Sequence, residues 1–436
     1  MEETKYKNYS QLLRSELILA RGCTEPIALA YAGAKAREVL GTMPEHCHVK
    51  CSGNIIKNVS GVIVPKSGGL RGVDVAVTLG IIGGTASYTL DVLRSVTEDH
   101  AKQTQEKLRQ NFCTCELAEG VENLYLQVEV SDADRNALVE ISRYHTNITK
   151  IEKNHEILFQ KENEEEHDLH SAKKKLCVED ILRYADSVDL EEIRPTLEQQ
   201  IACNSEIARE GMQGSWGAQI GKTLLEKWPE DLLPVRAAAL AAAGSDARMN
   251  GCDLPVVINS GSGNQGITAS LPVILYAREL DVSHDELLRA LAVSNLIALH
   301  QKRFIGSLSA YCGATSAACG AACGIAYLRC NMKIKDGSMS ISDRYNVISG
   351  VITNTICTIG GMVCDGAKSS CAAKIASAVQ TALLSVDMAF ANRVFQPGEG
   401  LVMDTVEETI AAVGQVGREG MQSTDIEILN MMLRQR

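Results

Sequence analysis

The hydrophobic positions near the N-terminus recur at helical spacing. They predict one helix over about Tyr9 to Ala20 and a second that begins after Thr24, with Pro26 in its first turn, where a missing N–H group has no consequence. The segment GCTEP therefore marks the start of a helix. Because free backbone N–H groups and the helix dipole favour a thiolate there, the pKa of Cys23 is expected to be lowered. Cys23 is a candidate reactive thiol, and a buried spectator cysteine is the alternative.

The pattern changes between His46 and about Gln160. The short β-prone runs there are HVKCSG, GVIVP, VDVAVTLGII, YLQVEV and EILFQ. Residues 95–111 and 131–145 have helical patterns, and Ser131 and Asp132 are candidate N-caps for the second helix. These elements predict a compact α/β domain. It ends in the charged run 161–175, which is predicted to be a solvated connector.

From about Cys177 onward almost every segment has a helical pattern. The sequence therefore predicts an α+β protein in which a large all-α domain carries an inserted, smaller α/β domain. The expected boundaries are 1–44 for the N-terminal part of the helical domain, 45–172 for the inserted domain and 173–436 for the rest.

Two stretches, 304–328 and 345–364, carry no formal charge and are long enough to span a bilayer. They consist of Ala, Gly, Ser, Thr, Asn and Cys rather than the Leu, Ile and Phe that make insertion favourable, so buried, closely packed helices are predicted and a membrane partner is not. Helices with such faces often pack against a second copy, and a homodimer is expected.

Composition narrows the class of protein. The chain of 436 residues has a formal net charge of -11 and no basic stripe, which argues against a nucleic-acid partner. The N-terminal segment lacks the pattern of a signal peptide, so a cytoplasmic location is expected. In that reducing compartment, 15 cysteines indicate metal binding, catalysis or simple burial rather than disulfides.

The segment SGSGNQG contains a GxGxxG spacing at Gly261, Gly263 and Gly266. A dinucleotide site would also need a second strand that ends in an acidic residue, and the sequence has an amphipathic helix there instead. What remains is a run of N–H groups and hydroxyls at the start of a helix, which suits a carboxylate or a phosphate.

The spacing of the cysteines limits the metal sites that they could form. Cys312, Cys319, Cys323 and Cys330 would share one stripe of a helix, but the first and last would be ~27 Å apart, so at most an adjacent pair could serve one cofactor. On an unbroken helix, Cys364 and Cys371 would be ~10 Å apart, too far for one zinc ion. A turn at Gly366 or a larger inorganic group, such as an iron–sulfur cluster, would relieve that distance. Packed core cysteines are the alternative.

Five motifs, RGCTEP, SGNIIKN, SGSGNQG, SAYCGA and MVCDGAKSSC, together resemble the L-cysteine desulfidases, which are 4Fe-4S lyases, and more distantly the α chain of iron–sulfur L-serine dehydratases. The resemblance covers nearly the whole chain. It implies that Cys312, Cys364 and Cys371 hold the cluster and that Cys23 is the base. The polar residues that it implies for substrate binding are Asn54, Asn58, Ser260, Ser262, Gly263 and Asn264. Additional cysteines, Cys319, Cys323 and Cys357, leave the choice of ligands open.

The implied reaction converts L-cysteine to hydrogen sulfide, pyruvate and ammonia without pyridoxal phosphate. The open iron of a cluster with three thiolates would accept the leaving sulfur while Cys23 takes the Cα proton. Lys302 could meet the substrate carboxylate, or it could be a cation at the end of a helix. The alternatives are an L-serine dehydratase with the same chemistry and a non-catalytic small-molecule or redox-sensing protein on the same fold.

Overall fold

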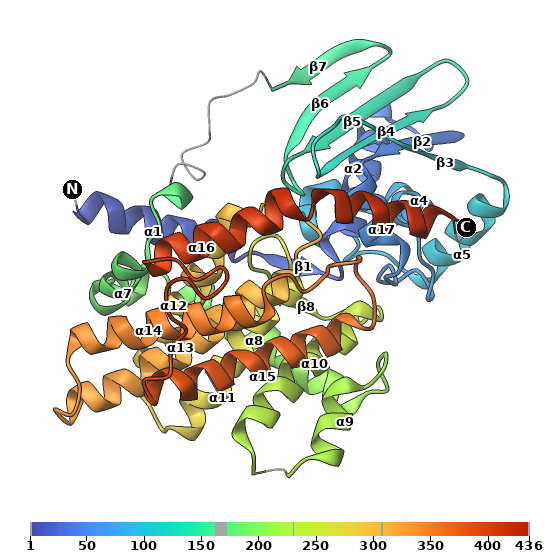
Figure 1. The fold of residues 1–436 in the computed structure, drawn as a ribbon. Helices are drawn as coiled ribbons and strands as arrows, with labels where there is room; N and C mark the ends of the chain where they lie inside the picture. Colours follow the sequence, from blue (N-terminus) through green and yellow to red (C-terminus); the bar gives the residue numbers. More distant parts are fainter. Residues whose placement is uncertain (1, 162–171, 230, 307, 435–436) are drawn as a thin grey trace.

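The computed structural model describes residues 2–161, 172–229, 231–306 and 308–434. A large helical unit lies beside a smaller unit that is built on a six-stranded sheet, which confirms the predicted α+β class (Figure 1). Among the described helices, none is long and apolar enough to cross a membrane.

The larger sheet has the strand order β3-β2-β4-β5-β6-β7. Only the β2–β3 pair is parallel, and the other neighbours are antiparallel. Buried side chains alternate with partly exposed ones along β4 and β5, as expected for strands with one face on a core. The strands are β2 (His46–Cys51), β3 (Cys113–Leu117), β4 (Tyr125–Ser131), β5 (Asn136–Ser142), β6 (Ile148–Lys153) and β7 (Glu156–Gln160).

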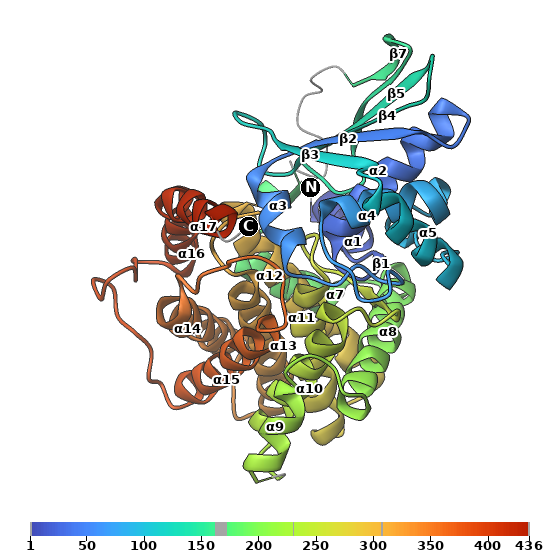
Figure 2. The ribbon, with the colours of Figure 1, turned by 90° about the vertical axis from the view of Figure 1, so that its right-hand side faces the viewer.

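Helices pack against this sheet and against each other. The helix α2 contacts β4, β5 and α4, and α4 in turn contacts α5 and β3 (Figure 2). A β-carbon at Gly80 would lie 2.2 Å from the carbonyl oxygen of Ala30, so glycine allows the close approach of α2 and α4. The helices are α2 (Thr24–Leu40), α3 (Gly53–Ser60), α4 (Val73–Gly83) and α5 (Glu98–Arg109), with a short 3₁₀ segment η1 (Ala86–Asp91).

Three predicted elements of this unit are wrong. The run VDVAVTLGII forms α4, not a strand, because an apolar run buried on all sides has no period that separates helix from strand. The run GVIVP is a turn and loop. Residues 131–145 form the end of β4, a turn and β5, because Ala137, Val139 and Ile141 alternate toward the core; Asp132 accepts a hydrogen bond from the Arg135 amide in that turn instead of capping a helix.

The helical unit is built around α13, which contacts α11, α12, α14 and α15 (Figure 2). Its buried residues include many alanines and glycines, which allow the axes to come close. The helices are α1 (Glu2–Glu16), α7 (Val178–Ser187), α8 (Arg194–Gln213), α9 (Ile220–Lys227), α10 (Leu233–Met249), α11 (Gly263–Glu279), α12 (His284–Ile305), α13 (Gly313–Lys335), α14 (Ile341–Ile359), α15 (Cys371–Phe390), α16 (Val406–Gln415) and α17 (Gln422–Arg434). Two short turns, η2 (Leu190–Glu192) and η3 (Val416–Gly420), complete it.

The two units meet near the N-terminus. Of the two helices expected in the helical domain, α1 lies against α12, whereas α2 packs against the sheet. Between them, β1 (Leu19–Arg21), which takes up residues predicted as helix, pairs with β8 (Pro255–Val257). The boundaries 1–44, 45–172 and 173–436 stay predictions, and most of the predicted connector, residues 162–171, lies outside the described residues.

Candidate functional site

Two loops bring Cys312 and Cys364 together. Tyr311 and Val363 form an antiparallel bridge, flanked by hydrogen bonds from the Cys312 amide to the Met362 carbonyl (2.8 Å) and from the Cys364 amide to the Ala310 carbonyl (2.6 Å). Alternation along the two segments then puts both thiols on the same face. Cys312 is the N-cap of α13, and the thiols of Cys312 and Cys364 are hydrogen-bonded to each other.

The turn expected at Gly366 is present. Gly366 has φ 96°, and a β-carbon there would lie 2.4 Å from the carbonyl oxygen of Lys57. Residues 362–370 are not helical, and α15 begins at Cys371, whose thiol donates to the Gly366 carbonyl at 3.7 Å. The segment therefore folds back on itself, and Cys371 is close enough to influence the ionisation of Cys312.

The cysteines of this group differ in acidity. The hydrogen bond from Cys312 lowers the pKa of Cys364 to about 6, against the effect of burial and with help from Lys57. The same hydrogen bond and burial raise the pKa of Cys312. Burial also raises the pKa of Cys371. Of the three, Cys364 is the thiol that most readily becomes a thiolate.

Cys23 lies at the N-cap of α2, as predicted, and is 3% exposed. It packs with Val62 and Met249 in a small cluster against which Cys371 also lies. Its thiol donates to Glu25 Oε2 at 3.1 Å. Burial and the Glu25 carboxylate raise the pKa of Cys23, so the expectation that the helix start would lower it is wrong: desolvation and a neighbouring negative charge outweigh the dipole.

Several polar side chains surround the Glu25 carboxylate. Thr24 Oγ1 donates to Oε2 at 3.2 Å, Asn58 Nδ2 donates to Oε1 at 3.1 Å, and His145 Nε2 lies 3.9 Å from Oε1. Burial alone would raise the pKa of Glu25, but His145 and the thiol of Cys23 lower it to about 2. The carboxylate is therefore charged although it is only 8% exposed.

The other predicted substrate residues lie on α3 and at the start of α11. Asn54, on α3, has a buried Oδ1 without a hydrogen-bond partner. In the second segment, Ser260 donates to Asn259 Oδ1 at 2.8 Å, and Ser262 is the N-cap of α11 without a capping side-chain bond. Thr24 Oγ1 donates to the carbonyl of Gly261 at 2.8 Å, which ties this segment to Cys23.

Gly263 and Asn264 contact a residue that the sequence did not indicate. A β-carbon at Gly263 would lie 2.2 Å from Arg248 Nε, and Asn264 Oδ1 accepts a hydrogen bond from Arg248 Nη1 at 3.1 Å. Arg248 also influences Cys23, whose pKa it lowers in part.

Two buried lysines face the cysteines. Burial lowers the pKa of Lys302 to about 8, and Cys364 and Cys312 oppose that shift. Lys302 lies in the last turn of α12, as the alternative of a cation at the end of a helix expected, and it is buried. Lys57, on α3 and 2% exposed, donates to the Cys364 carbonyl at 3.4 Å and forms an ion pair with Asp425 of α17.

Sequence reasoning missed Glu25, His145, Arg248 and Lys57. Glu25 and Lys57 lie inside two of the quoted motifs, and an arginine at the end of an alanine-rich helix is a signal that could have drawn attention to Arg248. A lone histidine after a strand gives no such signal, because His145 reaches Glu25 only through the packing of β5 against α2.

The additional cysteines near the motif lie inside helices, and further pairs lie on the sheet. Cys319 and Cys323 lie in α13 and Cys357 in α14. On the sheet, Cys47 and Cys113 have sulfur atoms 3.8 Å apart, and those of Cys51 and Cys115 are 3.9 Å apart.

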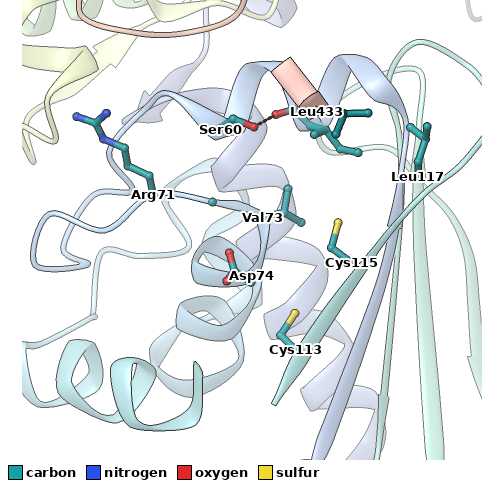
Figure 3. A pocket seen from close by; sticks show the side chains of 10 residues that line it. Ser60, Arg71, Val73, Asp74, Cys113, Cys115, Leu117 and Leu433 are labelled. Carbon is teal, nitrogen blue, oxygen red and sulfur yellow. Dashed lines mark hydrogen bonds between the residues drawn. The ribbon is translucent and has the colours of Figure 1, made fainter. Parts of the chain in front are cut away.

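A hollow of about 510 Å³ opens beside this part of the sheet (Figure 3). Cys113, Cys115, Val73 and Asp74 are among its lining residues. It is lined by none of the predicted site residues.

Cys312, Cys364 and Cys371 are the thiols that could hold an iron–sulfur cluster here. Within the described ranges, no group of three His, Cys, Asp or Glu side chains is placed to hold a single ion. A cluster distributes its thiolates over different irons. The ammonium groups of Lys57 and Lys302 stabilise thiolates, which is the form in which cysteine binds iron.

Comparison with known proteins identifies the family of the chain. Residues 87–430 match the family model described as serine dehydratase alpha chain. A UPF0597 protein of Lachnoclostridium phytofermentans is 47% identical over 428 residues, which cover 98% of this chain and 100% of that protein. UPF0597 proteins of Finegoldia magna (46%, covering 98% and 99%) and Treponema denticola (41%, covering 100% and 99%) are similar over the same extent. The chain belongs to the serine dehydratase alpha-chain family.

Proposed function

We propose that this protein is a 4Fe-4S-dependent carbon–sulfur lyase that converts L-cysteine to hydrogen sulfide, pyruvate and ammonia. The observation that carries the proposal is the gathering of Cys312, Cys364 and Cys371, from two loops far apart in sequence, beside the buried Cys23. When it is bound by three thiolates, such a cluster supplies an iron that can act as a Lewis acid toward a soft leaving sulfur.

Cys23 is proposed to take the Cα proton of the substrate as the Cβ–S bond breaks. Because burial and Glu25 hold Cys23 as a thiol, its own proton must leave first. Glu25 Oε2 accepts that thiol hydrogen at 3.1 Å, and Glu25 Oε1 faces His145 Nε2, which has no hydrogen-bond partner. We therefore assign Glu25 as the acceptor of this proton, a step that leaves Cys23 as a thiolate and Glu25 as a carboxylic acid. The aminoacrylate product then hydrolyses to pyruvate and ammonia.

An L-serine dehydratase is the second candidate, and the family description favours it. The same residues would act, but a hard hydroxyl group would leave instead of a thiolate. A non-catalytic small-molecule or redox-sensing protein is the third.

Anaerobically purified protein, reconstituted with iron and sulfide, distinguishes these functions. Each amino acid is supplied in turn, and sulfide, pyruvate and ammonia are measured with the visible spectrum of the protein. The proposal predicts equal amounts of sulfide and pyruvate from L-cysteine and a higher kcat/KM for L-cysteine than for L-serine. The opposite preference would identify a serine dehydratase. If the protein binds a cluster but turns over neither amino acid, the result would support the non-catalytic function.

The proposal includes a cytoplasmic homodimer. All 15 cysteines are free, as a reducing compartment requires. Light scattering of the reconstituted protein tests the subunit number, and a monomer at working concentration would contradict that part of the proposal.

A further inference from the structure

Arg248 is a buried cation with a partly unpaired guanidinium group. It lies in the last turn of α10 and is 2% exposed. Nη1 donates to Asn264, but Nε and Nη2 have no hydrogen-bond partner, and among the described residues no carboxylate forms an ion pair with it. A buried guanidinium without a counter-ion is strongly unfavourable, so an anion is expected to bind there.

The acidic residue nearest in sequence does not fill that role. Asp246, also on α10, accepts a hydrogen bond from the Gly221 amide at 3.3 Å. Residues two apart on a helix do not face each other, so Asp246 and Arg248 point to different neighbours. Burial raises the pKa of Asp246 to about 6, which indicates that the guanidinium does not hold its negative charge in place.

The free edge of Arg248 has the form that a carboxylate needs. Nε and Nη2 lie along one side of the planar guanidinium, where two parallel N–H bonds can meet two oxygens of one anion. Gly263 packs closely against that edge, because a β-carbon there would lie 2.2 Å from Nε, and a larger residue would crowd the Nε atom. The first turn of α11 lies beside it, and the positive end of that helix also favours an anion.

A complementary acceptor lies on the same turn. Gln265 is 6% exposed and its Oε1 has no hydrogen-bond partner. A β-carbon at Gly313 would lie 2.5 Å from Gln265 Cδ, so this amide reaches the residue next to Cys312. An unpartnered carbonyl oxygen there suits an ammonium group.

We propose that Arg248 binds the α-carboxylate and Gln265 Oε1 the α-ammonium of an amino acid held between Cys23 and Cys312. This inference rests on the proposed function, because that function supplies a zwitterionic substrate. It assigns to Arg248 the carboxylate contact that Lys302 was expected to make, and it restricts substrates to free α-amino acids.

Equilibrium binding of compounds that cannot react tests the site without turnover. L-alanine carries both groups, ethylamine lacks the carboxylate, and propionate lacks the ammonium. With the anaerobic, cluster-loaded full chain, L-alanine should bind at least ~10-fold more tightly than either analogue, since each analogue loses one set of charged hydrogen bonds. Equal binding of all three by the wild-type protein would overturn the proposal.

Variants of α10 then locate the contact. Arg248→Gln should weaken L-alanine binding at least ~10-fold and leave ethylamine binding unchanged, and Arg248→Lys should have a smaller effect. Arg236→Gln, on the same helix but paired with Glu279 at 2.9 Å, is the matched control and should bind as the wild type does. Unchanged L-alanine binding by Arg248→Gln would overturn the assignment.

Stability without ligand separates binding from a structural role. Although Arg248 is buried, Arg248→Met should lower the free energy of unfolding of the ligand-free protein only a little. The reason is that it removes an unpaired buried charge. If that variant fails to fold, Arg248 is structural and the proposal fails. Gly263→Ala, which keeps the charge but crowds Nε, should also lose L-alanine binding.

These results are independent of the proposed reaction. Arg248-dependent binding of L-alanine without sulfide release would sustain this inference and contradict the proposed function. Sulfide release with an unchanged KM for L-cysteine in Arg248→Gln would support the proposed function and contradict this inference.

Discussion

The Nε2 atom of His145 lies 3.9 Å from Oε1 of Glu25, and both side chains are about 10% exposed. His145 follows β5 of the sheet, whereas Glu25 is in the first turn of α2, two residues from Cys23. The contact therefore connects the end of a strand with the helix start that carries the proposed base.

Glu25 should make the free energy of unfolding depend on pH in the acidic range. Its folded-state pKa of about 2 lies below its ordinary value of 4.5, so it contributes stability that is fully present above pH 4.5 and is lost as the pH falls toward 2. That contribution is about 3 kcal/mol. Urea unfolding between pH 7 and pH 3.5 should show a steeper loss for the wild type than for Glu25→Gln. Glu38→Gln, at an exposed position of α2, should follow the wild type; equal slopes for all three proteins would contradict the shift.

Cys23→Ala should abolish turnover without loss of the cluster. Removal of the group that takes the Cα proton is expected to reduce sulfide release from L-cysteine at least ~100-fold. The iron content and visible spectrum should stay unchanged, because Cys23 is not a proposed ligand. Cys203→Ala, on α8 and half-buried, is the control. Wild-type activity in Cys23→Ala would remove this residue from the mechanism.

Cys364 and Cys357 offer a direct test of the ligand assignment. Cys357 lies in α14, seven residues before Cys364, and both are partly exposed. Cys364→Ser should lower the iron bound after reconstitution by more than half, whereas Cys357→Ser should bind as much iron as the wild type. Iron and acid-labile sulfide analysis measures the cluster content of both variants. Loss of iron in Cys357→Ser but not in Cys364→Ser would make Cys357 the ligand instead of Cys364.

The ion pair between Lys57 and Asp425 should stabilise the site, although Asp425 lies in α17 near the C-terminus. Lys57 is almost fully buried, so Asp425→Asn leaves a charge without its partner and is expected to lower the free energy of unfolding by about 3 kcal/mol. Glu427→Gln, an exposed change on the same helix, should have little effect.

The double variant Lys57→Met with Asp425→Leu should regain most of that loss, because it removes both charges. Chemical denaturation measures all four proteins. If the single variant is as stable as the wild type, the pair has no structural importance.

Periodicity predicted the elements whose sequence has one clear period. The helix α5 and the strand β4 have such a pattern, and each lies where it was expected. The apolar run of α4 has none, and β5 has a polar turn before it that imitates a helix cap. Local sequence could not resolve these two cases, since the packing of α2 against the sheet decides them.

The candidate site divides in the same way. Motif resemblance indicated Cys23, Cys312, Cys364 and Cys371, and a positive φ at Gly366 produces the turn that the spacing required. Partners such as His145 and Arg248 depend on contacts between distant segments, which no local pattern contains.

The distribution of this site over the chain has a consequence for biosynthesis. Cys23 lies near the beginning of the sequence, His145 follows a strand of the sheet, and Cys371 begins a helix of the last quarter. A ribosome must therefore release nearly the whole chain, and the two units must dock, before these residues lie together. Under the proposed function, iron would therefore be loaded after the chain has folded rather than during its synthesis.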